Sequence, residues 1–528
     1  MTSPDLVHIS RALISVSCKI GLTEFASTLS HMGVEILSTG GSSKKIADAG
    51  IPVVDVAKIT GFPEIMDGRI KTLHPLIHGG LLARRDKDDH VAAMNEYGIS
   101  QIDLLVVDLY PFEITQSRGV GYDESVENID IGGQAMIRAA SKNHEFVTVI
   151  VDVDDYGRLL DEMYAHNGYT TMAFRRKLAA IAYGRTASYD AAISVWLARE
   201  AGEIFPRRFT LSGFSPRMLR YGENPHQQAA FYRTTEKRFG VSNAEQIQGK
   251  KLSYNNLNDT AAAFELVSEL ERPGIAIIKH SNPCGVAVAN LLSEAWDAAL
   301  ASDPISAFGG IVAANRKIDF VTATKIAAIF VEVVIAPYFD QDALEVFIEK
   351  KNLRVLKTGG IPDPTSSGLI INNLSGGLLV QSRDTGRINQ DELKVVTKRY
   401  PTEAEIRDLL LAFRICKHVK SNAIVYVKDG STAAIGAGQT SRIDAAKIAA
   451  LKAKEMAEVA GELKPRTFGS VVASDAFLPF IDSLIIIAEA GATAIIQPGG
   501  SVRDKEIITV ANERNLAMVL TGMRHLFH

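Results

Sequence analysis

The chain has 528 residues, a hydrophobic fraction of 46% and a formal net charge of −4, and this length predicts roughly two to four domains with ample core. The small negative charge gives no general attraction to nucleic acid, and no apolar run approaches the roughly 20 residues that are needed to cross a membrane. Because the three cysteines are widely spaced and no secretory signal is evident, we expect a cytoplasmic protein without a disulfide framework or a cysteine-rich zinc site.

The N-terminal part of the chain alternates short apolar runs with segments of helical periodicity. The runs typical of buried strands lie at 11–16, 34–37, 103–109 and 146–151. Helical periodicity separates them, for example at 22–31 and 44–49. Strands joined by single helices predict a parallel sheet with helices on both faces.

A stretch rich in Gly, Pro and charge at 202–208 interrupts this pattern. We therefore expect a first domain at 1–202 and a second at 203–528, and the second is also predicted to be α/β. Its buried strands are expected at 275–278, 310–313, 423–427, 471–473 and 494–496. A tract rich in Gly, Pro and Ser at 358–377 is typical of a linker and predicts two subdomains.

Two loops at neighbouring strand ends of the first domain offer hydrogen-bond donors suited to a phosphate. One precedes a predicted helix and contains Ser38, Thr39, Gly40, Gly41 and Ser42. Glycines let backbone amides approach an anion, and the N-terminus of a helix adds partial positive charge. The other loop follows the first strand and supplies Ser15, Ser17 and Lys19. An ordinary turn with a helix N-cap also explains the Ser-Gly loop, but the two loops together favour a phosphate site.

The segment 69–80 mixes cations and imidazoles and is predicted to be a loop aimed at an anionic substrate. Pro75 and two glycines argue against a regular helix there. His74 and His78 have the spacing of a helical zinc site, but Pro75 and the lack of an adjacent Glu argue against that interpretation.

Two further segments of the first domain carry groups suited to proton transfer. Tyr110 follows a predicted strand, and Asp130 stands just before a predicted helix that carries Lys142. With Lys71, these side chains would place a carboxylate, a phenol and two lysines over one pocket.

The second domain carries Lys279 and His280 directly after the predicted strand at 275–278, and a rigid Asn-Pro-Cys-Gly turn follows. The pair offers a proton acceptor near neutral pH beside a fixed positive charge. A surface lysine and a core histidine are the ordinary alternative. The turn favours the functional interpretation because it holds both side chains in place.

Long motifs in both halves are similar to those of one enzyme family. The N-terminal motifs lie at 38–41, 61–69, 71–75, 109–112 and 130–133. The C-terminal motifs lie at 220–227, 279–280, 306–310, 420–423, 436–442 and 474–480. In this order, over nearly the whole chain, they resemble the bifunctional purine-biosynthesis enzymes that join AICAR transformylase to IMP cyclohydrolase.

The resemblance implies an N-terminal parallel-sheet domain similar to methylglyoxal synthase and two C-terminal α/β subdomains similar to cytidine deaminase. Zinc deaminases carry a His-x-Glu and a Pro-Cys-x-x-Cys signature, which the sequence around Cys284 lacks, so no catalytic metal is expected. The run 435–441 begins like a dinucleotide fingerprint, but Ser441 stands at the third glycine position. We interpret it as a nucleotide-phosphate loop with Arg442 rather than the NAD site of an oxidoreductase.

For the transformylase, the resemblance implies formyl transfer from 10-formyltetrahydrofolate to the amine of AICAR, which gives FAICAR. His280 would accept the amine proton, Lys279 would stabilise the developing oxyanion or the leaving folate nitrogen, and Asn422 would orient the substrate. The other residues implied to bind substrates are Arg220, Tyr221, Phe308, Gly309, Arg442, Phe477, Phe480 and Asp482. The phenylalanines are equally explained as ordinary core residues.

For the cyclohydrolase, the resemblance implies that the carboxamide nitrogen of FAICAR attacks its own formyl carbon and that loss of water gives IMP. Lys71 and Lys142 would stabilise the oxyanion and the phosphate, while Tyr110 and Asp130 would transfer protons. The residues implied to bind the substrate are Arg69, Ser15, Ser17, Lys19 and the loop 38–42.

Three positions around the cyclohydrolase pocket depart from the family pattern: Cys18, Leu76 and Asp108 stand where Asp, Lys and Asn are usual. We hypothesise that Cys18 and Asp108 compensate each other by moving one carboxylate across the pocket. The alternative is a transformylase whose N-terminal domain only binds a ligand.

The resemblance also implies a homodimer with transformylase sites between its subunits, and it leaves the binding of a monovalent cation open. The expected partners are otherwise small-molecule substrates, with neither nucleic acid nor a membrane among them.

Overall fold

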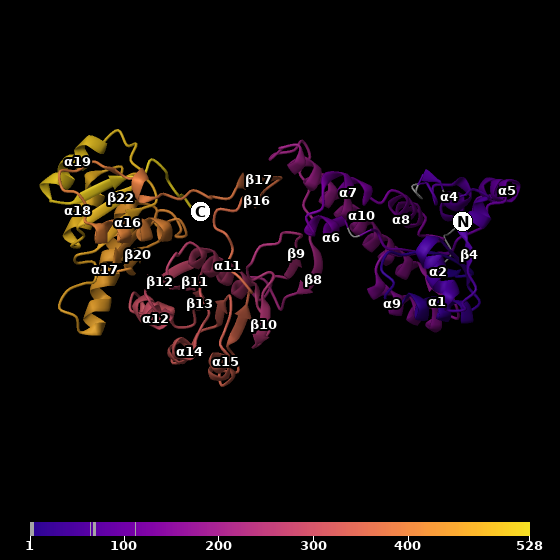
Figure 1. The fold of residues 1–528 in the computed structure, drawn as a ribbon, viewed down its shortest axis with the longest axis horizontal. Helices are drawn as coiled ribbons and strands as arrows, with labels where there is room; N and C mark the ends of the chain where they lie inside the picture. The colour runs from indigo at the N-terminus through magenta and orange to yellow at the C-terminus, as the bar shows by residue number, and fades with distance from the viewer. Residues whose placement is uncertain (1–4, 64, 67–69, 111) are drawn as a thin grey trace. The chain divides into compact units, whose positions relative to one another are not determined.

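The structure of the chain is a computed structural model that describes residues 5–63, 65–66, 70–110 and 112–528. It contains two compact units, which can be followed by the colours of Figure 1. Unit 1 comprises Met1–Ser215 and Tyr232–Thr235, and unit 2 comprises Pro216–Phe231 and Glu236–His528. Each unit has its own sheet and its own hydrophobic core.

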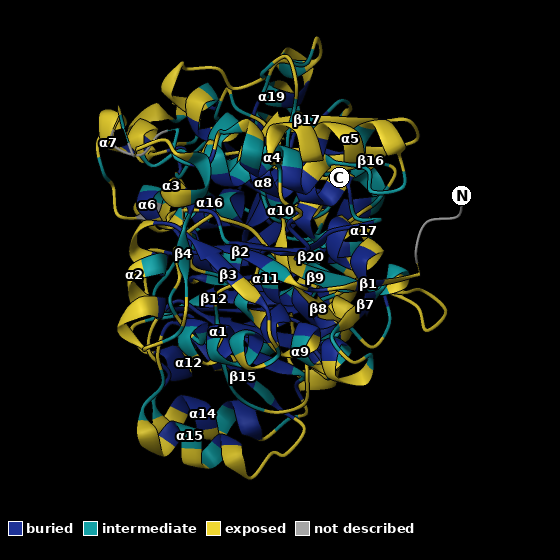
Figure 2. Cartoon of the chain, turned by 90° about the vertical axis from the view of Figure 1, so that its right-hand side faces the viewer, coloured by how far each residue is buried: buried dark blue, intermediate teal, exposed yellow. Residues whose placement is uncertain are grey.

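A five-stranded sheet forms the centre of unit 1, with the strand order β4-β3-β2-β5-β6. Its strands are β2 (Arg11–Ser15), β3 (Glu35–Ser38), β4 (Val54–Asp55), β5 (Leu104–Val107) and β6 (Thr148–Ile150). All neighbours are parallel, which confirms the predicted parallel sheet. The central strands are buried and dark blue in Figure 2, which explains their runs of Leu, Ile and Val. A separate antiparallel pair joins β1 (Leu6–His8) to β7 (Tyr169–Thr171).

In the described part of unit 1, ten helices and a 3-10 turn surround the sheet. Their bounds are α1 (Leu22–His31), α2 (Gly40–Asp48), α3 (Val56–Thr60), α4 (Pro75–Leu82), α5 (Asp88–Tyr97), α6 (Phe112–Ser117), α7 (Tyr122–Glu127), α8 (Gly132–Lys142), α9 (Tyr156–Ala165) and α10 (Met172–Glu200), with a 3-10 turn η2 (Val153–Asp155). Side chains cap the starts of α3, α4 and α10. The hydroxyl of Thr171, for example, accepts from the amide of Phe174 and starts the long α10.

Helix α4 corrects one expectation, because the sequence predicts a loop over the segment that contains it. Pro75 stands at the first helical position, where a missing amide breaks no intrahelical hydrogen bond. The Nδ1 atom of His74 accepts from the amide of Leu76 and caps the helix. Proline therefore marks the start of a helix here.

Unit 2 is built on one twelve-stranded sheet whose two halves have the same pairing pattern. The first half comprises β11 (Gly274–Lys279), β12 (Asn282–Val288), β13 (Ile311–Ala314), β14 (Val333–Ala336) and β15 (Arg354–Lys357). The second comprises β19 (Ile424–Lys428), β20 (Ser431–Gly436), β21 (Val471–Ser474), β22 (Ala494–Gln497) and β23 (Ala517–Leu520). In each half an antiparallel hairpin is followed by three parallel strands. Pairing of β12 with β20 joins the halves.

Each half ends at an antiparallel edge strand, β10 (Glu245–Gln248) beside β15 and β18 (Lys394–Val395) beside β23. Two hairpins lie outside the large sheets, β8 (Phe214–Met218) with β9 (Ala230–Arg233) and β16 (Leu369–Leu374) with β17 (Gly377–Ser382). The helices of unit 2 are α11 (Tyr254–Ser268), α12 (Leu292–Leu300), α13 (Pro304–Ala307), α14 (Phe320–Ala327), α15 (Gln341–Ile348), α16 (Glu403–Cys416), α17 (Arg442–Ala460), α18 (Ile481–Glu489) and α19 (Asp504–Glu513), with the 3-10 turn η3 (Gln390–Glu392). In the described part of the chain, no helix combines the length and apolarity that a membrane span requires.

A buried ionic cluster joins the ends of α11 and α16 in unit 2. The carboxylate of Glu269, which is almost fully buried, lies 2.8 Å from the Lys417 ammonium and 3.5 Å from Nε2 of His418. Burial alone would raise the pKa of Glu269, but His418 and Lys417 together lower it to about 2. The cluster thus contributes stability above the ordinary pKa of a glutamate, and that stability is lost as the pH falls from about 5 toward 2.

Replacing Glu269 with Gln tests this cluster. We expect the free energy of unfolding at pH 7 to fall by about 3–5 kcal/mol, because the substitution leaves a buried ammonium uncompensated. We also expect the loss of stability between pH 5 and pH 2 to become shallower. Denaturant unfolding measures both, and Glu271→Gln, which disrupts the more exposed pair with Arg414, is the control and should cost at most about 1 kcal/mol.

Candidate functional site

In unit 1, the carboxyl ends of neighbouring parallel strands bring the two predicted phosphate loops together. Ser15 ends β2, and its hydroxyl lies 3.3 Å from that of Thr39, which follows β3. The Lys19 ammonium donates to the hydroxyl of Ser42 at 2.9 Å. The hydroxyl of Ser38 is instead directed inward and donates to the carbonyl of Ile14 at 2.7 Å.

Lysine side chains lie beside the N-terminus of α2. Thr39 precedes α2, but its side chain makes no capping hydrogen bond, so the N-cap explanation of this loop finds no support. Gly40 has a positive φ of 47°, and a Cβ placed on it would lie 2.8 Å from the Lys71 ammonium. Gly41 lies close to the stem of Lys19. Two lysines thus flank a helix N-terminus, an arrangement suited to a phosphate.

Asp108 anchors the first of these loops. Its carboxylate accepts the backbone amides of Ser17 and Cys18, the second at 2.8 Å. Burial raises the pKa of Asp108, although the two amides act to lower it. The Cys18 thiol is exposed. The two positions that depart together from the family pattern are therefore in direct contact, through the Asp108 carboxylate and the Cys18 backbone.

Asp130 and Tyr110 are also brought together. The Asp130 carboxylate accepts from the amide of Gly133 at 2.8 Å, and the backbone amide of Tyr110 acts to lower its pKa. Burial raises the pKa of Asp130. The Tyr110 ring is 56% exposed and so is accessible to a ligand.

Lys142 is the predicted residue that the geometry sets apart. It is exposed and ends α8, about 15 Å along the helix axis from Gly132 at a rise of about 1.5 Å per residue. Arg69 lies outside the described residues. The His78 imidazole lies in α4, and burial lowers its pKa. Among the described residues, no group of three His, Cys, Asp or Glu side chains is placed to hold a metal ion.

In unit 2, the turn that carries His280 is held by a carboxylate on α11. Lys279 ends β11, and His280 and Ser281 form the two-residue turn to β12, with φ of 52° and 59°. Asp259 accepts the backbone amides of both turn residues, at 3.2 Å and 2.9 Å. The Lys279 ammonium donates to the carbonyl of Phe308 at 2.9 Å. A held ammonium and an exposed imidazole on a held backbone thus lie at one strand end.

A loop from the other half of the sheet meets this turn. The side-chain oxygen of Asn282 accepts from the amide of Lys420 at 3.1 Å. Two residues further on, the backbone and side chain of Asn422 donate to the carbonyl of Gln439 at 3.0 Å and 2.9 Å. The structure therefore brings the loops of His280 and Asn422 side by side.

Arg220 and Tyr221 are connected to the same helix face. The Arg220 guanidinium lies 5.5 Å from the centroid of the Tyr221 ring. Their loop is tied to α11 because the Asn255 side chain donates to the carbonyl of Glu223 at 3.4 Å. Asn255 and Asp259 are four residues apart, so they share one face of α11.

The aromatic residues expected to contact substrates are exposed. Phe308, Phe477 and Phe480 are 60%, 37% and 46% exposed, which contradicts their explanation as core residues. Gly309 has a positive φ of 75° beside Phe308, and Asp482 is exposed in the first turn of α18.

The Arg442 guanidinium, which the sequence predicts to bind a phosphate, is partly paired within the protein. Its NH2 group lies 2.9 Å from the carboxylate of Asp475, which is fully buried, and its Nε donates to the hydroxyl of Ser474 at 3.3 Å. Part of the guanidinium is thus used to hold the strand end of β21.

The sequence interpretation misses the residues that hold these turns. Asp259 stands inside an ordinary helical pattern, and Gln439 in a glycine-rich loop suggests a ligand contact rather than a backbone acceptor. The sequence does not show that a carboxylate on a helix supports a distant turn, because that contact exists only in the folded structure.

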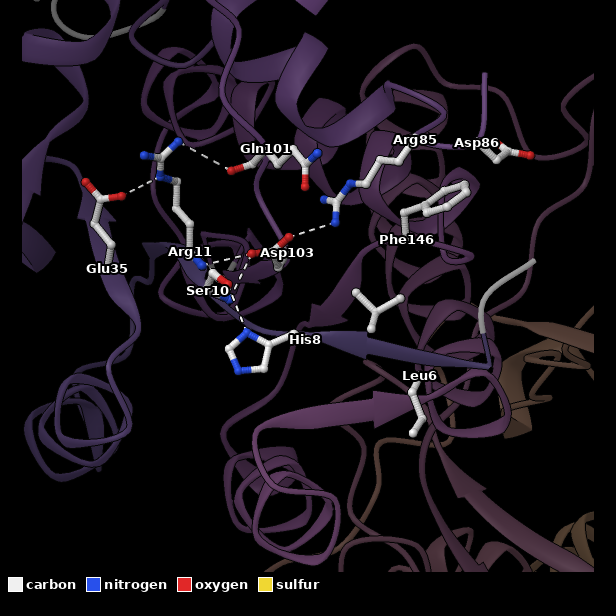
Figure 3. A pocket seen from close by; sticks show the side chains of 11 residues that line it. Leu6, His8, Ser10, Arg11, Glu35, Arg85, Asp86, Gln101, Asp103 and Phe146 are labelled. Carbon is white, nitrogen blue, oxygen red and sulfur yellow. Dashed lines mark hydrogen bonds and ion pairs between the residues drawn. The ribbon is translucent and has the colours of Figure 1, made fainter. Parts of the chain in front are cut away.

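A separate hollow of about 630 Å³ lies at the opposite, amino ends of the unit 1 strands (Figure 3). Arg11 begins β2, and its Nε is 2.6 Å from the carboxylate of Glu35, which begins β3. Arg85 pairs with Asp103 at 2.7 Å. Both guanidinium groups are paired with protein carboxylates, so this hollow does not have the open cationic character of the phosphate loops.

Comparison with known proteins gives matches along almost the entire chain. The family model described as AICARFT/IMPCHase bienzyme matches residues 140–452, and the MGS-like domain matches residues 21–135. Two relatives are the bifunctional purine biosynthesis proteins PurH of Parvibaculum lavamentivorans, 61% identical over 99% of this chain and 98% of its own, and of Roseobacter denitrificans, 59% identical over 99% and 100%. The protein of the same name from Brucella canis is 59% identical over 100% of this chain and 98% of its own.

These matches account for both units. The MGS-like match covers the parallel sheet that carries the phosphate loops, and the larger match covers much of unit 2 with its His280 turn. Identity near 60% over the full length leaves no part of the chain to another family. The chain belongs to the AICARFT/IMPCHase bienzyme family.

Proposed function

We propose that this chain catalyses the two reactions of its family with the residues described above. Formyl transfer from 10-formyltetrahydrofolate to AICAR gives FAICAR, and ring closure of FAICAR with loss of water gives IMP. We assign the transformylase to residues 203–528, with two subdomains that divide near 358–377, and the cyclohydrolase to residues 1–202. Identity near 60% to relatives named for both activities supports the pair of reactions.

The transformylase centre is proposed at the meeting of the His280 and Asn422 loops. The amine of AICAR is a poor nucleophile because its lone pair is delocalised into the imidazole, so removal of its proton and positioning must supply the rate. His280 accepts the proton, Lys279 stabilises the developing oxyanion, and Asn422 orients the substrate. The observation that carries this proposal is the 3.1 Å bond between Asn282 and Lys420, which joins the two loops.

The remaining transformylase contacts follow from exposure and charge. The exposed rings of Phe308, Phe477 and Phe480 offer apolar surface to the substrate base and the pterin. The other proposed ligand-binding residues are Arg220, Tyr221, Gly309, Arg442 and Asp482. We propose that no catalytic metal takes part, since the chemistry requires only proton transfer and charge stabilisation, and that a monovalent cation has at most a structural role.

The cyclohydrolase centre is proposed at the carboxyl ends of the unit 1 strands. Asp130 and Tyr110 transfer the protons, and Lys71 and Lys142 stabilise the oxyanion and the phosphate. The proposed phosphate contacts are Ser15, Ser17, Lys19, Ser38, Thr39, Gly40, Gly41, Ser42 and Arg69.

We propose a homodimer in the cytoplasm. The hairpin β16–β17 supports the dimer, because a lone two-stranded hairpin is marginally stable and this one exposes five large apolar side chains to between 37% and 56%. These side chains are Leu369, Ile370, Leu374, Leu378 and Leu379.

A second candidate function is a transformylase with a non-catalytic, ligand-binding N-terminal domain. One observation favours it: the Asp108 carboxylate occupies the amides of Ser17 and Cys18, which a phosphate loop would otherwise offer to its ligand.

Incubation of the purified protein with AICAR and 10-formyltetrahydrofolate separates the two candidates. We expect tetrahydrofolate and IMP, with IMP forming faster than from FAICAR alone. FAICAR that accumulates without enzyme-dependent IMP would establish the second candidate instead. Chromatographic separation of the products over time is the measurement.

Replacing Asp108 with Asn tests whether the two departures compensate. The amide accepts from one backbone N–H and turns its NH₂ group toward the other, so we expect the cyclisation turnover to fall about tenfold, for a lost bond of about 1–3 kcal/mol. The transformylase rate of the same preparation is the control. An unchanged cyclisation turnover would contradict the hypothesis of a shifted carboxylate.

Replacing Gly40 with Ala tests the phosphate loop. The added methyl group displaces the Lys71 ammonium, so we expect the KM for FAICAR to rise about tenfold or more. Gly50→Ala is the matched control, since Gly50 also has a positive φ, of 74°, but its Cβ would meet no atom within 4 Å. Equal effects of the two substitutions would show that backbone strain, and not Lys71, is responsible.

A further inference from the structure

We propose that Tyr189 is a positioning residue of the cyclohydrolase centre, which holds the loop of Asp130 and the strand end of Tyr110 in register with each other. This inference rests on the proton-transfer roles proposed for Asp130 and Tyr110. Tyr189 itself does not face the substrate, because it is fully buried in α10.

The phenol of Tyr189 makes two hydrogen bonds to one loop. Its oxygen accepts from the backbone amide of Asp130 at 2.9 Å and donates to the carbonyl of Asn128 at 3.3 Å. Burial raises the pKa of Tyr189 to about 12, so the phenol keeps its proton across the physiological range. The bonds of Tyr189 to Asp130 and Asn128 are therefore maintained while Asp130 titrates.

The contacts around Tyr189 form a closed circuit. The backbone amide of Tyr110 lies beside the Asp130 carboxylate and acts to lower its pKa. The carbonyl of Tyr110 accepts from the amide of Phe112 at 2.8 Å. The ring of Phe112 then packs edge-on against the ring of Tyr189, with 6.3 Å between centroids and 68° between planes. Tyr189 thus contacts the Asp130 loop directly and the segment that carries Tyr110 through Phe112.

Charged side chains lie close to Asp130 and Tyr189. Asp108 lies close enough to Asp130 to raise its pKa, in addition to the larger effect of burial. The Arg185 guanidinium lies 5.6 Å from the centroid of the Tyr189 ring and 3.1 Å from the carboxylate of Glu113. Tyr189→Phe removes one oxygen from this environment and changes no charge, so its effect reports on position.

Ring closure is sensitive to such positioning. A bond forms between the carboxamide nitrogen and the formyl carbon, the carboxamide nitrogen and the formamide nitrogen each give up one proton, and the formyl oxygen leaves with both protons as water. Both proton transfers need their donor and acceptor within hydrogen-bond reach of the substrate. A displacement of about 1 Å at a site of this kind costs about 100-fold in rate.

The test compares Tyr189→Phe with wild type in both reactions of the intact chain. We expect the kcat of cyclisation to fall between about tenfold and 100-fold while the KM for FAICAR stays within about threefold, since the phosphate loops are untouched. The acid limb of the kcat profile should move to lower pH, because the released Asp130 carboxylate gains contact with water. The transformylase rate and the melting temperature measure folding, and Tyr183→Phe, on the same helix, is the matched control.

Each other outcome overturns the inference. Unchanged cyclisation in Tyr189→Phe would show that the circuit does not position the centre. A loss that appears equally in the transformylase, or in Tyr183→Phe, would reduce Tyr189 to a structural role. Asp130→Asn and Tyr110→Phe keep the two hypotheses apart: if both retain full cyclisation, the proposed function of this centre fails, whereas if both lose it and Tyr189→Phe does not, only the inference about Tyr189 fails.

Discussion

The functional turns of this protein depend on carboxylates that accept backbone amides. A strand that stops to present a side chain leaves amides without partners, and a buried amide must be satisfied. Asp108 and Asp259 each accept two such amides beneath a proposed active centre, Asp130 accepts that of Gly133, and Asp103 and Asp408 each accept two elsewhere. Charge-assisted bonds of this kind are stronger than neutral ones, so a few carboxylates fix the irregular backbone.

In unit 2, the carboxylate that holds the backbone and the side chain proposed for catalysis belong to different residues. Asp259 fixes the backbone of the His280 turn and leaves the imidazole exposed, and this imidazole is the base that we propose. In unit 1 the roles overlap, because Asp130 both accepts the Gly133 amide and is the proposed proton-transfer group. Burial raises the pKa of both Asp108 and Asp130.

The sequence predicts the strands and helices of both units because the spacing of apolar residues is a local signal. Parallel strands with single helices between them, and glycine loops at their ends, follow from runs of a few residues. The helix α4 is missed because Pro75 is judged as a breaker, although it starts the helix under the cap of His74. Asp259 and Tyr189 are missed for another reason: their partners lie 21 and 59 residues away, and no local pattern records such contacts. Exposed aromatic residues, likewise, are distinguished from core residues only by the fold.

The two halves of the unit 2 sheet repeat one arrangement of strand end, turn and supporting carboxylate. In the second half, the turn at 429–430 is also held by a helical carboxylate, Asp408, and Lys428 at the strand end donates to the carbonyl of Phe468 at 2.9 Å, as Lys279 does to Phe308 in the first half. The second turn has no imidazole. The same scaffold thus forms with and without a histidine, so the support of the turn is independent of the imidazole that we propose as the base.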